Sequence, residues 1–388
     1  MKIVMLCDFF GIGQQYQENY FSKYYQKLGH QVIIIASTFE NINDYYLNNY
    51  DKKRLKSEQV IENIKLIRLP YFINFANKIR RYKGVYKILC EEKPDFIFVH
   101  NIHFNLNDAV SYKIKNKNCK IILDFHGDYS NSAKKWISLN IMHKLIWKPY
   151  LMHFKKYLNK IYGIVPEGIK FIHEVYGVDY SEIDLLPLGC DYDLANEIRE
   201  NSSKIELKKK YNILLEDFVI ITGGKLNPEK KTDILIDAMK LINKKNLHLI
   251  IFGAADKQNV DYEKELKNKS TGYNVHFTGW INSKSILELM NISDVAVFPA
   301  SQSVMWQQAI GMHLPLIVGD SGLQDASYLN QNNNVIVLNK QRINVDSIRS
   351  VLLDLIRFPN KIKNMRDGAK KTAEQLLNYE IIVKKTLE

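Results

Sequence analysis

The feature that most constrains the fold of this chain is a repeated alternation of short apolar runs and helix-like stretches. In the N-terminal third, the runs KIVMLCDF, HQVIIIAS, DFIFVH and KIILDF are separated by segments such as QENYFSKYYQKLG. Continuous apolar runs between helices are typical of parallel strands that are buried on both faces. The runs FVIITGGKL, HLIIFGAAD, VHFTGW, DVAVFPAS and LPLIVGDSG repeat this pattern in the second half. The sequence therefore predicts an α/β fold with two doubly wound sheets.

The length of the chain supports two domains. A chain of 388 residues is too long for one ordinary hydrophobic core, so we expect two domains of roughly 150–200 residues each. The segment 188–215 is polar, charged and poor in strand-forming residues. We therefore expect an N-terminal Rossmann-like domain over residues 1–190 and a C-terminal one over 191–374, facing a central cleft that closes about this hinge. A final helix at about 375–388 is expected to pack back on the N-terminal domain.

Charge and cysteine usage restrict the partners and the compartment. The formal net charge of +12 favours an acidic partner, which leaves a nucleotide sugar, a phospholipid surface and nucleic acid open. The four cysteines have no CxxC spacing, the start MKIVMLCDFF lacks a long apolar signal core, and no apolar run approaches a bilayer span of about 20 residues. We expect a cytoplasmic protein with reduced thiols that contacts the inner face of a plasma membrane only peripherally.

Two glycines follow the first predicted strand. Gly11 and Gly13 lie in DFFGIGQQYQEN, before a helix that begins near Gln17. Glycines let backbone N–H groups approach an anion at a helix N-terminus, where the helix dipole also favours negative charge. A tight turn without a ligand explains them equally well. The full dinucleotide fingerprint is absent, because Tyr16 stands where a third glycine is required.

Histidines follow two later strands. His126 and Asp128 lie in HGDYSN after KIILDF, and His126 there can donate a hydrogen bond to a sugar hydroxyl or phosphate, or cap the next segment. His100 and His103 follow DFIFV with the i, i+3 spacing of a metal pair, but no third ligand has a matching spacing. Structural roles explain His100 and His103 equally well. We therefore predict no metal site and no cofactor.

The strongest local signal is TGGKLNPEKKTDILIDAM. Gly224 and Lys225 end a predicted strand, and Lys230 lies just before a predicted helix. Two cations beside a glycine-relaxed turn suit a diphosphate, which carries about two negative charges. A solvated lysine run is the alternative, although Lys225 follows a buried strand directly.

This segment resembles the GRL…EKG…LI.A signature of GT-B glycosyltransferases, family 4 (group 1) in particular. KLGHQVIII, LLPLGCD and VHFTGWINSKSILELMNISDVAVFPAS resemble further family segments, in the same order along most of the chain. The resemblance implies that Lys225 and Lys230 bind the donor diphosphate and that His126 is the active-site histidine of the N-terminal domain. It also implies that Gly11 and Gly13 let the N-terminal loop approach the reaction centre.

The stretch FPASQSVMWQQAIGMHLP departs from the family pattern, which has two glutamates eight positions apart. Gln308 takes the second position, and its amide oxygen can still accept hydrogen bonds from ribose hydroxyls. Ala300 takes the first position and cannot replace a carboxylate that contacts the donor sugar. Ser301, Gln302 or a one-residue gap in the alignment is the alternative.

The rest of this corner keeps groups that can bind a donor. The backbone amides of Ser303, Val304 and Met305 lie at a predicted helix N-terminus, where they can hold phosphate or sugar oxygens. Asp325 in SGLQDAS takes the acidic position of an element that closes the nucleotide pocket in the family, with Ser321 replacing a glycine.

A lysine-rich segment over residues 134–160 contains no acid and is interleaved with aromatic residues. Such a surface suits anionic lipid, although a core helix with solvated lysines fits equally well. Nucleic acid fits less well, and we expect none as a partner.

The resemblance implies a transferase that moves a sugar from a nucleotide-diphosphate donor, UDP-linked in our prediction, to a growing, lipid-linked bacterial surface glycan such as capsule or lipopolysaccharide. In the family account of retaining enzymes, the leaving phosphate assists the acceptor hydroxyl, so no carboxylate base is obligatory. The missing glutamates motivate a rival from another class, a non-catalytic GT-B-like subunit that binds a glycan or stabilises a partner. A nucleotide-sugar epimerase of the same architecture is a weaker rival.

Overall fold

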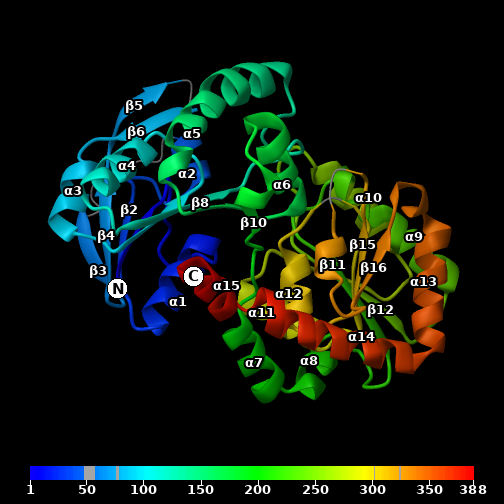
Figure 1. Ribbon diagram of the computed structural model, residues 1–388. Coiled ribbons are helices and arrows are strands. Elements are labelled where there is room, and N and C mark those ends of the chain that lie inside the picture. Colours follow the sequence, from blue (N-terminus) through cyan, green and yellow to red (C-terminus); the bar gives the residue numbers. More distant parts are fainter. Residues whose placement is uncertain (48–56, 76–77, 301, 323–324) are drawn as a thin grey trace. The chain divides into compact units, whose positions relative to one another are not determined.

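The computed structural model describes residues 1–47, 57–75, 78–300, 302–322 and 325–388. They form two compact units, shown in Figure 1: an N-terminal unit of Met1–Pro187 with Ile382–Glu388, and a C-terminal unit of Leu188–Ile381. The first crossing lies close to the predicted boundary after residue 190, and the return to the N-terminal unit comes at residue 382 rather than at about 375.

Residues 382–388 belong to the N-terminal unit because their side chains form hydrogen bonds with other residues of that unit. In α15 (Tyr379–Leu387), the Thr386 hydroxyl lies 2.6 Å from the Tyr25 hydroxyl, and Lys385 Nζ donates to the Leu185 carbonyl at 2.8 Å. Just before this helix, the Cys190 amide donates to the Leu377 carbonyl at 2.9 Å, which keeps that turn in the C-terminal unit.

The described part of the N-terminal unit is built on an eight-stranded sheet in the order β10-β9-β8-β7-β1-β2-β4-β3. All neighbouring pairs are parallel except β3 with β4, and β5 pairs with β6 in a separate antiparallel sheet. The strands are β1 (Lys2–Leu6), β2 (Gln31–Ser37), β3 (Glu58–Ile61), β4 (Ile64–Leu69), β5 (Tyr71–Phe75), β6 (Ile79–Tyr82), β7 (Phe96–His100), β8 (Lys120–Phe125), β9 (Lys160–Gly163) and β10 (Ile183–Leu185).

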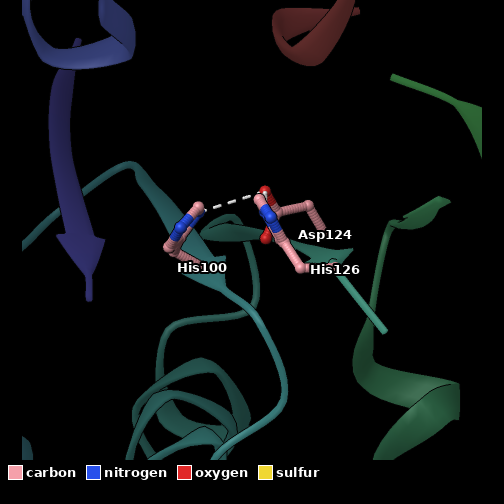
Figure 2. Close-up of side chains that lie close together, drawn as sticks. All are labelled: His100, Asp124 and His126. Atoms are coloured by element: carbon pink, nitrogen blue, oxygen red, sulfur yellow. Dashed lines mark hydrogen bonds and ion pairs between the residues drawn. The ribbon is translucent and has the colours of Figure 1, made fainter. Parts of the chain in front are cut away.

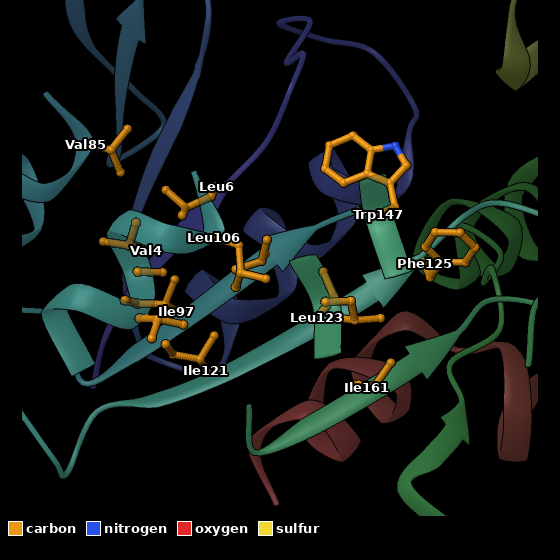
Figure 3. Packing of buried hydrophobic residues seen from close by; sticks show 14 of the residues in the cluster. Val4, Leu6, Val85, Ile97, Leu106, Ile121, Leu123, Phe125, Trp147 and Ile161 are labelled. Carbon is orange, nitrogen blue, oxygen red and sulfur yellow. The ribbon is translucent and has the colours of Figure 1, made fainter. Parts of the chain in front are cut away.

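Helices pack on this sheet through alternate side chains of the strands. Val4 and Leu6 of β1 point to the same face because side chains along a strand alternate, and Figure 3 shows them in one buried cluster with Ile97, Leu106 and Trp147. The helical segments are α1 (Gln17–Lys27), α2 (Ile42–Tyr46), α3 (Val85–Glu92), α4 (Leu106–Lys115), a π-helical segment (Ser138–Trp147), α5 (Lys148–Phe154), α6 (Pro166–Phe171) and a second π-helical segment (Ile172–Tyr176).

The described part of the C-terminal unit has a six-stranded, fully parallel sheet in the order β13-β12-β11-β14-β15-β16. Its strands are β11 (Phe218–Gly223), β12 (Leu247–Phe252), β13 (Val275–Gly279), β14 (Val295–Phe298), β15 (Leu316–Gly319) and β16 (Val335–Leu338). Its helices are α7 (Tyr192–Asn201), α8 (Lys204–Lys210), α9 (Thr232–Ile242), α10 (Val260–Lys269), α11 (Ser283–Asn291), α12 (Met305–Gly311), α13 (Val345–Arg357) and α14 (Pro359–Thr372), which a π-helical turn (Ala373–Leu377) follows.

Each sheet has one point where the strand order reverses. In the N-terminal unit the chain builds outward from β1 through β2 and then continues on the other side of β1 with β7. In the C-terminal unit it builds from β11 through β12 and β13 and then returns to the other side of β11 with β14. The predicted α/β fold with two Rossmann-like, doubly wound domains is therefore confirmed. Ligands of such sheets bind at the carboxyl ends of the strands beside this point.

Candidate functional site

The loop after β1 carries the two predicted glycines of the N-terminal unit. Gly13 has a φ of +72°, a backbone conformation that favours glycine. The Gly11 carbonyl accepts a hydrogen bond from Asn19 Nδ2 of α1 at 2.8 Å, and the Phe10 carbonyl accepts one from Arg68 Nη2 at 2.7 Å. Arg68 lies on β4 and is almost fully buried. The glycine loop is therefore fixed in place at the point where the strand order reverses.

His126 lies one residue beyond β8 and belongs to a chain of ionisable groups, shown in Figure 2. His126 Nε2 lies 2.9 Å from Oδ2 of the fully buried Asp124, and the same oxygen lies 3.1 Å from Nδ1 of His100 at the end of β7. On its other side, His100 Nε2 lies 3.5 Å from a carboxylate oxygen of Glu18 in α1. A single carboxylate therefore joins two imidazoles at the carboxyl ends of neighbouring strands.

The electrostatics of this cluster favour its charged forms. Burial alone would raise the pKa of Asp124, but the charges and hydrogen bonds of His100 and His126 hold it well below its ordinary value. Burial alone would lower the pKa of His100, but the Asp124 carboxylate, with smaller contributions from Glu18 and Asp8, raises it to about 9. At neutral pH the buried carboxylate is therefore ionised beside a cationic His100.

His126 was predicted from the sequence, whereas the roles of Asp124, His100 and Glu18 were not. One signal in the sequence points to Asp124, because Asp124 and His126 are two residues apart, which is the spacing of one strand face. His100 lies opposite Asp124 in the parallel register of β7 and β8, which only the folded sheet defines. Glu18 has no such signal, because its position depends on how α1 packs.

The same three side chains have the composition of a metal site. One ligand atom each from His100, Asp124 and His126 lie within 4.8 Å of one another. His103, whose i, i+3 spacing from His100 resembles a metal pair, is not part of this group. Asp128, by contrast, accepts from the amides of Ser130 and Asn131 at 2.7 and 2.9 Å, so it shapes the local turn.

The glycine turn after β11 presents Lys225 in the C-terminal unit. Gly223 and Gly224 have φ values of +155° and +111°, and a Cβ on Gly223 would lie 2.2 Å from the Phe252 carbonyl, so the first position requires glycine. Lys225 is exposed, and its Nζ lies 2.7 Å from Oδ2 of Asp256, in the loop that follows the neighbouring strand β12. The cation predicted to bind a diphosphate therefore has an acidic partner at the same edge of the sheet.

Lys230 connects this turn to the corner after β14. Its Nζ donates to the Gln302 carbonyl at 3.0 Å, and burial lowers the pKa of its ammonium. It forms no ion pair with a carboxylate in the part of the chain that the structure describes. The structure thus joins Lys230 to the corner after β14, where the strand order of this sheet reverses, whereas Lys225 pairs with Asp256 on the β12 side of β11.

The corner itself keeps some of the predicted groups in place. Ala300 is buried in the core of the unit, and Ser301 lies outside the described residues. Gln308 Oε1 lies 3.4 Å from the Asp191 amide nitrogen, which donates to it. Asp325 Oδ1 accepts from the Ser327 amide at 2.8 Å and caps a short turn.

The helix of this corner, α12, begins at Met305 with Val304 as its N-cap. The Met305 amide donates to Ser303 Oγ at a long 3.3 Å. With only seven residues, α12 has a small dipole, so its N-terminus attracts anions less than the two lysines do.

Family models match almost the whole chain. Residues 13–194 match the model described as Glycosyltransferase Family 4, and residues 203–372 match the model described as Glycosyl transferases group 1. With two doubly wound sheets and these matches, the protein is a glycosyltransferase of the GT-B fold. Within that class, the chain belongs to the family 4-like, group 1 glycosyltransferases.

Solved structures of the same fold align over nearly their full lengths. A glycosyltransferase from Rickettsia africae has a TM-score of 0.68 and 15% identity and covers 100% of this chain and 96% of its own. HepE from Anabaena, in complex with UDP, has the same TM-score and identity and covers 100% and 98%. WaaG, a glycosyltransferase involved in lipopolysaccharide biosynthesis, has a TM-score of 0.62 and 16% identity and covers 99% and 98%. No protein of curated function matches the sequence significantly.

Proposed function

We propose that this protein transfers a sugar from a UDP-linked donor to a growing, lipid-linked bacterial surface glycan, with retention at the anomeric carbon and without a metal ion. The observation that carries the proposal is the contact of Lys230 with the Gln302 corner between β11 and β14, with Lys225 following β11 at the same edge of the sheet. Two ammonium groups beside a glycine turn suit the two phosphates of a nucleotide diphosphate.

Lys230 is the stronger of the two anchors in this proposal. It is partly desolvated and, among the residues that the structure describes, donates to a neutral carbonyl and pairs with no carboxylate, so an arriving diphosphate supplies a counter-charge there. Lys225 has to break its ion pair with Asp256 before it can bind a diphosphate, but this pair is exposed and contributes little. Gln308, half-buried on α12, is proposed to accept from the ribose hydroxyls.

The choice of UDP and of a surface glycan is supported by solved structures of the same fold. HepE is described in complex with UDP, and also with UDP-glucose, and WaaG is described as acting in lipopolysaccharide biosynthesis. The net charge of +12 favours anionic substrates in general and agrees with both choices.

The proposed reaction needs no carboxylate base in the donor corner. The acceptor oxygen attacks the anomeric carbon from the face that the diphosphate leaves. The acceptor proton passes to the departing phosphate oxygen as the bond from that oxygen to the anomeric carbon breaks. Lys225 and Lys230 stabilise the charge that develops on the leaving group, which is the dominant catalytic term in such a mechanism. This is compatible with Ala300 and Gln308 at the two family glutamate positions.

In the N-terminal unit, His126 is the proposed contact to the donor sugar. Its imidazole is oriented by Asp124, which is ionised and fixed by His100, so the free ring nitrogen can be presented in one defined tautomer. The loop of Gly11 and Gly13, which follows β1, offers backbone N–H groups at the same edge of the sheet.

A membrane surface is the proposed site of the acceptor. Trp136, Ile137 and Leu145 are 71%, 63% and 69% exposed in and just before the π-helical segment Ser138–Trp147. Lys134, Lys135 and Lys144 are exposed beside them. In the described ranges, none of the helices is both long and apolar enough to cross a membrane. Exposed apolar side chains flanked by lysines suit peripheral contact with anionic lipid, each cation contributing about 1 kcal/mol.

Calorimetric titration tests the donor site directly. The purified protein is titrated with UDP, GDP and their common sugar conjugates, and the titration is repeated with Lys225→Ala, Gln308→Ala and the control Lys244→Ala, an exposed lysine beyond the end of α9. We expect UDP to bind and both site variants to weaken it about tenfold, equivalent to about 1.4 kcal/mol, with no change in the control. Absence of binding by any nucleotide at millimolar concentration contradicts the proposal.

A non-catalytic subunit is the second candidate, and the buried Ala300 favours it. A glutamate at this position would need solvent or a sugar hydroxyl as partner, whereas this side chain packs in the core. The two candidates differ in turnover. A transferase releases UDP from a UDP-sugar in the presence of lipid-linked acceptor and loses this activity in Lys230→Ala, whereas a binding subunit releases none and retains its partner in that variant.

A further inference from the structure

The C-terminal unit carries a second cationic site, at the end of α12 away from Met305. A cavity of about 310 Å³ opens there beside Met312 and His313. Four of its lining side chains are arginine or lysine and one is acidic: Arg199, Lys204, Arg366 and Lys370, with Asp367. They come from α7, α8 and α14, so the fold brings together charges that are far apart in the sequence.

The two arginines are held in place by backbone carbonyls. Arg199 Nη1 donates to the Gly311 carbonyl at the C-terminus of α12. Arg366 Nη2 donates to the Ser293 carbonyl at 2.7 Å and pairs with Asp294 at 3.3 Å. These contacts leave further guanidinium N–H groups of both arginines for a ligand, because each guanidinium has five. The cavity therefore has a rigid cationic wall.

The two lysines at the cavity are exposed and not neutralised. Neither the Lys204 nor the Lys370 ammonium forms an ion pair with any side chain in the described ranges. Asp294 already pairs with Arg366, which leaves Asp367 as the acidic group of the lining. Like charges brought together without counter-charge repel each other, and a bound anion removes this repulsion.

His313 supplies an independent observation. Its amide donates to the Ile310 carbonyl at 2.9 Å and the Leu314 amide donates to the Ala309 carbonyl at 2.9 Å, which is the Schellman pattern at the end of α12. Glycine is the usual residue at this left-handed position, yet His313 occupies it with a φ of +59°. Its side chain reaches the cavity, and its buried Nε2 has no hydrogen-bond partner in the described structure.

The neutral imidazole of His313 fits the same ligand chemistry. Burial and the neighbouring Arg199, Lys370 and Arg366 lower the pKa of His313 to about 3, so the ring is neutral at physiological pH. A neutral ring with its proton on Nε2 donates one hydrogen bond, and an anionic oxygen is the acceptor that these surroundings favour.

We propose that this cavity binds a small phosphate-type anion with at least two negative charges, of the size of a diphosphate or a phosphorylated sugar. Arginine and lysine together suit phosphate oxygens, and 310 Å³ is within the range of small-molecule sites. The site lies about 10 Å from the donor corner along α12, which has seven residues at about 1.5 Å each.

Pyrophosphate is the probe. Because the proposed donor site would also bind pyrophosphate, its two lysines are first replaced by alanine. The double variant Lys225→Ala/Lys230→Ala is titrated with pyrophosphate by calorimetry at physiological salt, then again after addition of Lys204→Ala and Lys370→Ala. The matched control adds Lys363→Ala, an exposed lysine of α14. We expect the double variant to bind one pyrophosphate, the added site variants to weaken binding at least tenfold, and the control to leave it unchanged. No binding by the double variant at millimolar pyrophosphate, or binding that Lys204→Ala and Lys370→Ala leave unchanged, overturns the proposal.

A second variant separates the proposal from a general loss of folding. His313→Gly removes the backbone strain, so we expect a higher Tm together with weaker pyrophosphate binding. A higher Tm with unchanged binding would exclude His313 from the site. Vesicles containing phosphatidic acid provide the other arm. Binding of both pyrophosphate and these vesicles, each lost in the Lys204→Ala/Lys370→Ala background, identifies a lipid headgroup as a source of the phosphate, whereas binding of pyrophosphate alone restricts the site to a small soluble anion.

Discussion

His100 and Asp124 stand opposite each other on the neighbouring parallel strands β7 and β8, and His100 Nδ1 lies 3.1 Å from Asp124 Oδ2. The carboxylate also orients His126, the predicted histidine of the active site. The orientation of His126, the proposed contact to the donor sugar, therefore depends on a buried ion pair that spans two strands. This pair makes its own contribution to stability, which can be measured separately from catalysis.

Asp124→Asn is expected to lower both stability and turnover. The amide keeps the shape but removes the charge that balances His100, and breaking one side of a buried pair costs about 3 kcal/mol. Urea unfolding at pH 7 measures the loss, and the exposed Asp261→Asn serves as the control. Equal unfolding free energies for Asp124→Asn and the wild type would contradict the assigned role of the carboxylate.

The pH dependence of stability follows from the same pair. The pKa of His100 is raised to about 9, so its contribution is complete below its unfolded value of about 6.5 and is lost as the pH rises through about 9. The pKa of Asp124 is lowered, so its contribution is present above about 3.8 and is lost as the pH falls. We expect the pair to stabilise most between about pH 4 and pH 6.5.

The measurement compares the wild type with His100→Gln in urea at pH 6 and pH 10. The wild type should exceed the variant by up to about 3 kcal/mol at pH 6, from a shift of about two and a half pKa units, and the difference should vanish at pH 10. A difference that is the same at both pH values would show that His100 is not charged in the folded protein.

Asp256→Asn is expected to strengthen UDP binding. Asp256 holds Lys225 Nζ at 2.7 Å, so it competes with a donor diphosphate for this cation. Because the pair is exposed, the gain is small, about two- to fivefold in Kd. Calorimetry with UDP measures it. In the double variant Lys225→Ala/Asp256→Asn the gain should disappear, and a gain that persists there would assign the effect to general electrostatics.

Removal of divalent cations is expected to leave sugar transfer unchanged. Asp124 Oδ2 already accepts hydrogen bonds from the imidazoles of His100 and His126. These three side chains therefore do not need a metal ion to hold them together. The assay measures UDP release before and after treatment with EDTA. If activity is lost and returns with Zn²⁺ or Mn²⁺, then His100, Asp124 and His126 form a metal centre instead.

The sequence predicted the fold and the donor corner because their signals are local. Apolar runs mark the strands, and the glycines before Lys225 mark the turn that follows β11. The pairing of His100 with Asp124 was missed because it depends on the register of two strands that lie 24 residues apart. The cationic cavity could not be predicted from the sequence, because Arg199, His313 and Arg366 come together only after three helices have packed. The role of Gln308 was predicted from its place in the corner, but its contact with the Asp191 amide requires the folded backbone.

Arg68 has a consequence for protein engineering. The Arg68 guanidinium, on β4, donates to the carbonyls of Ser37 at 3.0 Å and Phe10 at 2.7 Å. These hydrogen bonds hold the loop of Gly11 and Gly13 in place. Loops at the carboxyl ends of strands are attractive pieces to exchange between transferases when a new acceptor is wanted. A graft of residues 8–16 into another scaffold would carry the glycines but would lack the hydrogen bonds from Arg68. Such a chimera has to include β4 as well, which makes the transferable module discontinuous in sequence.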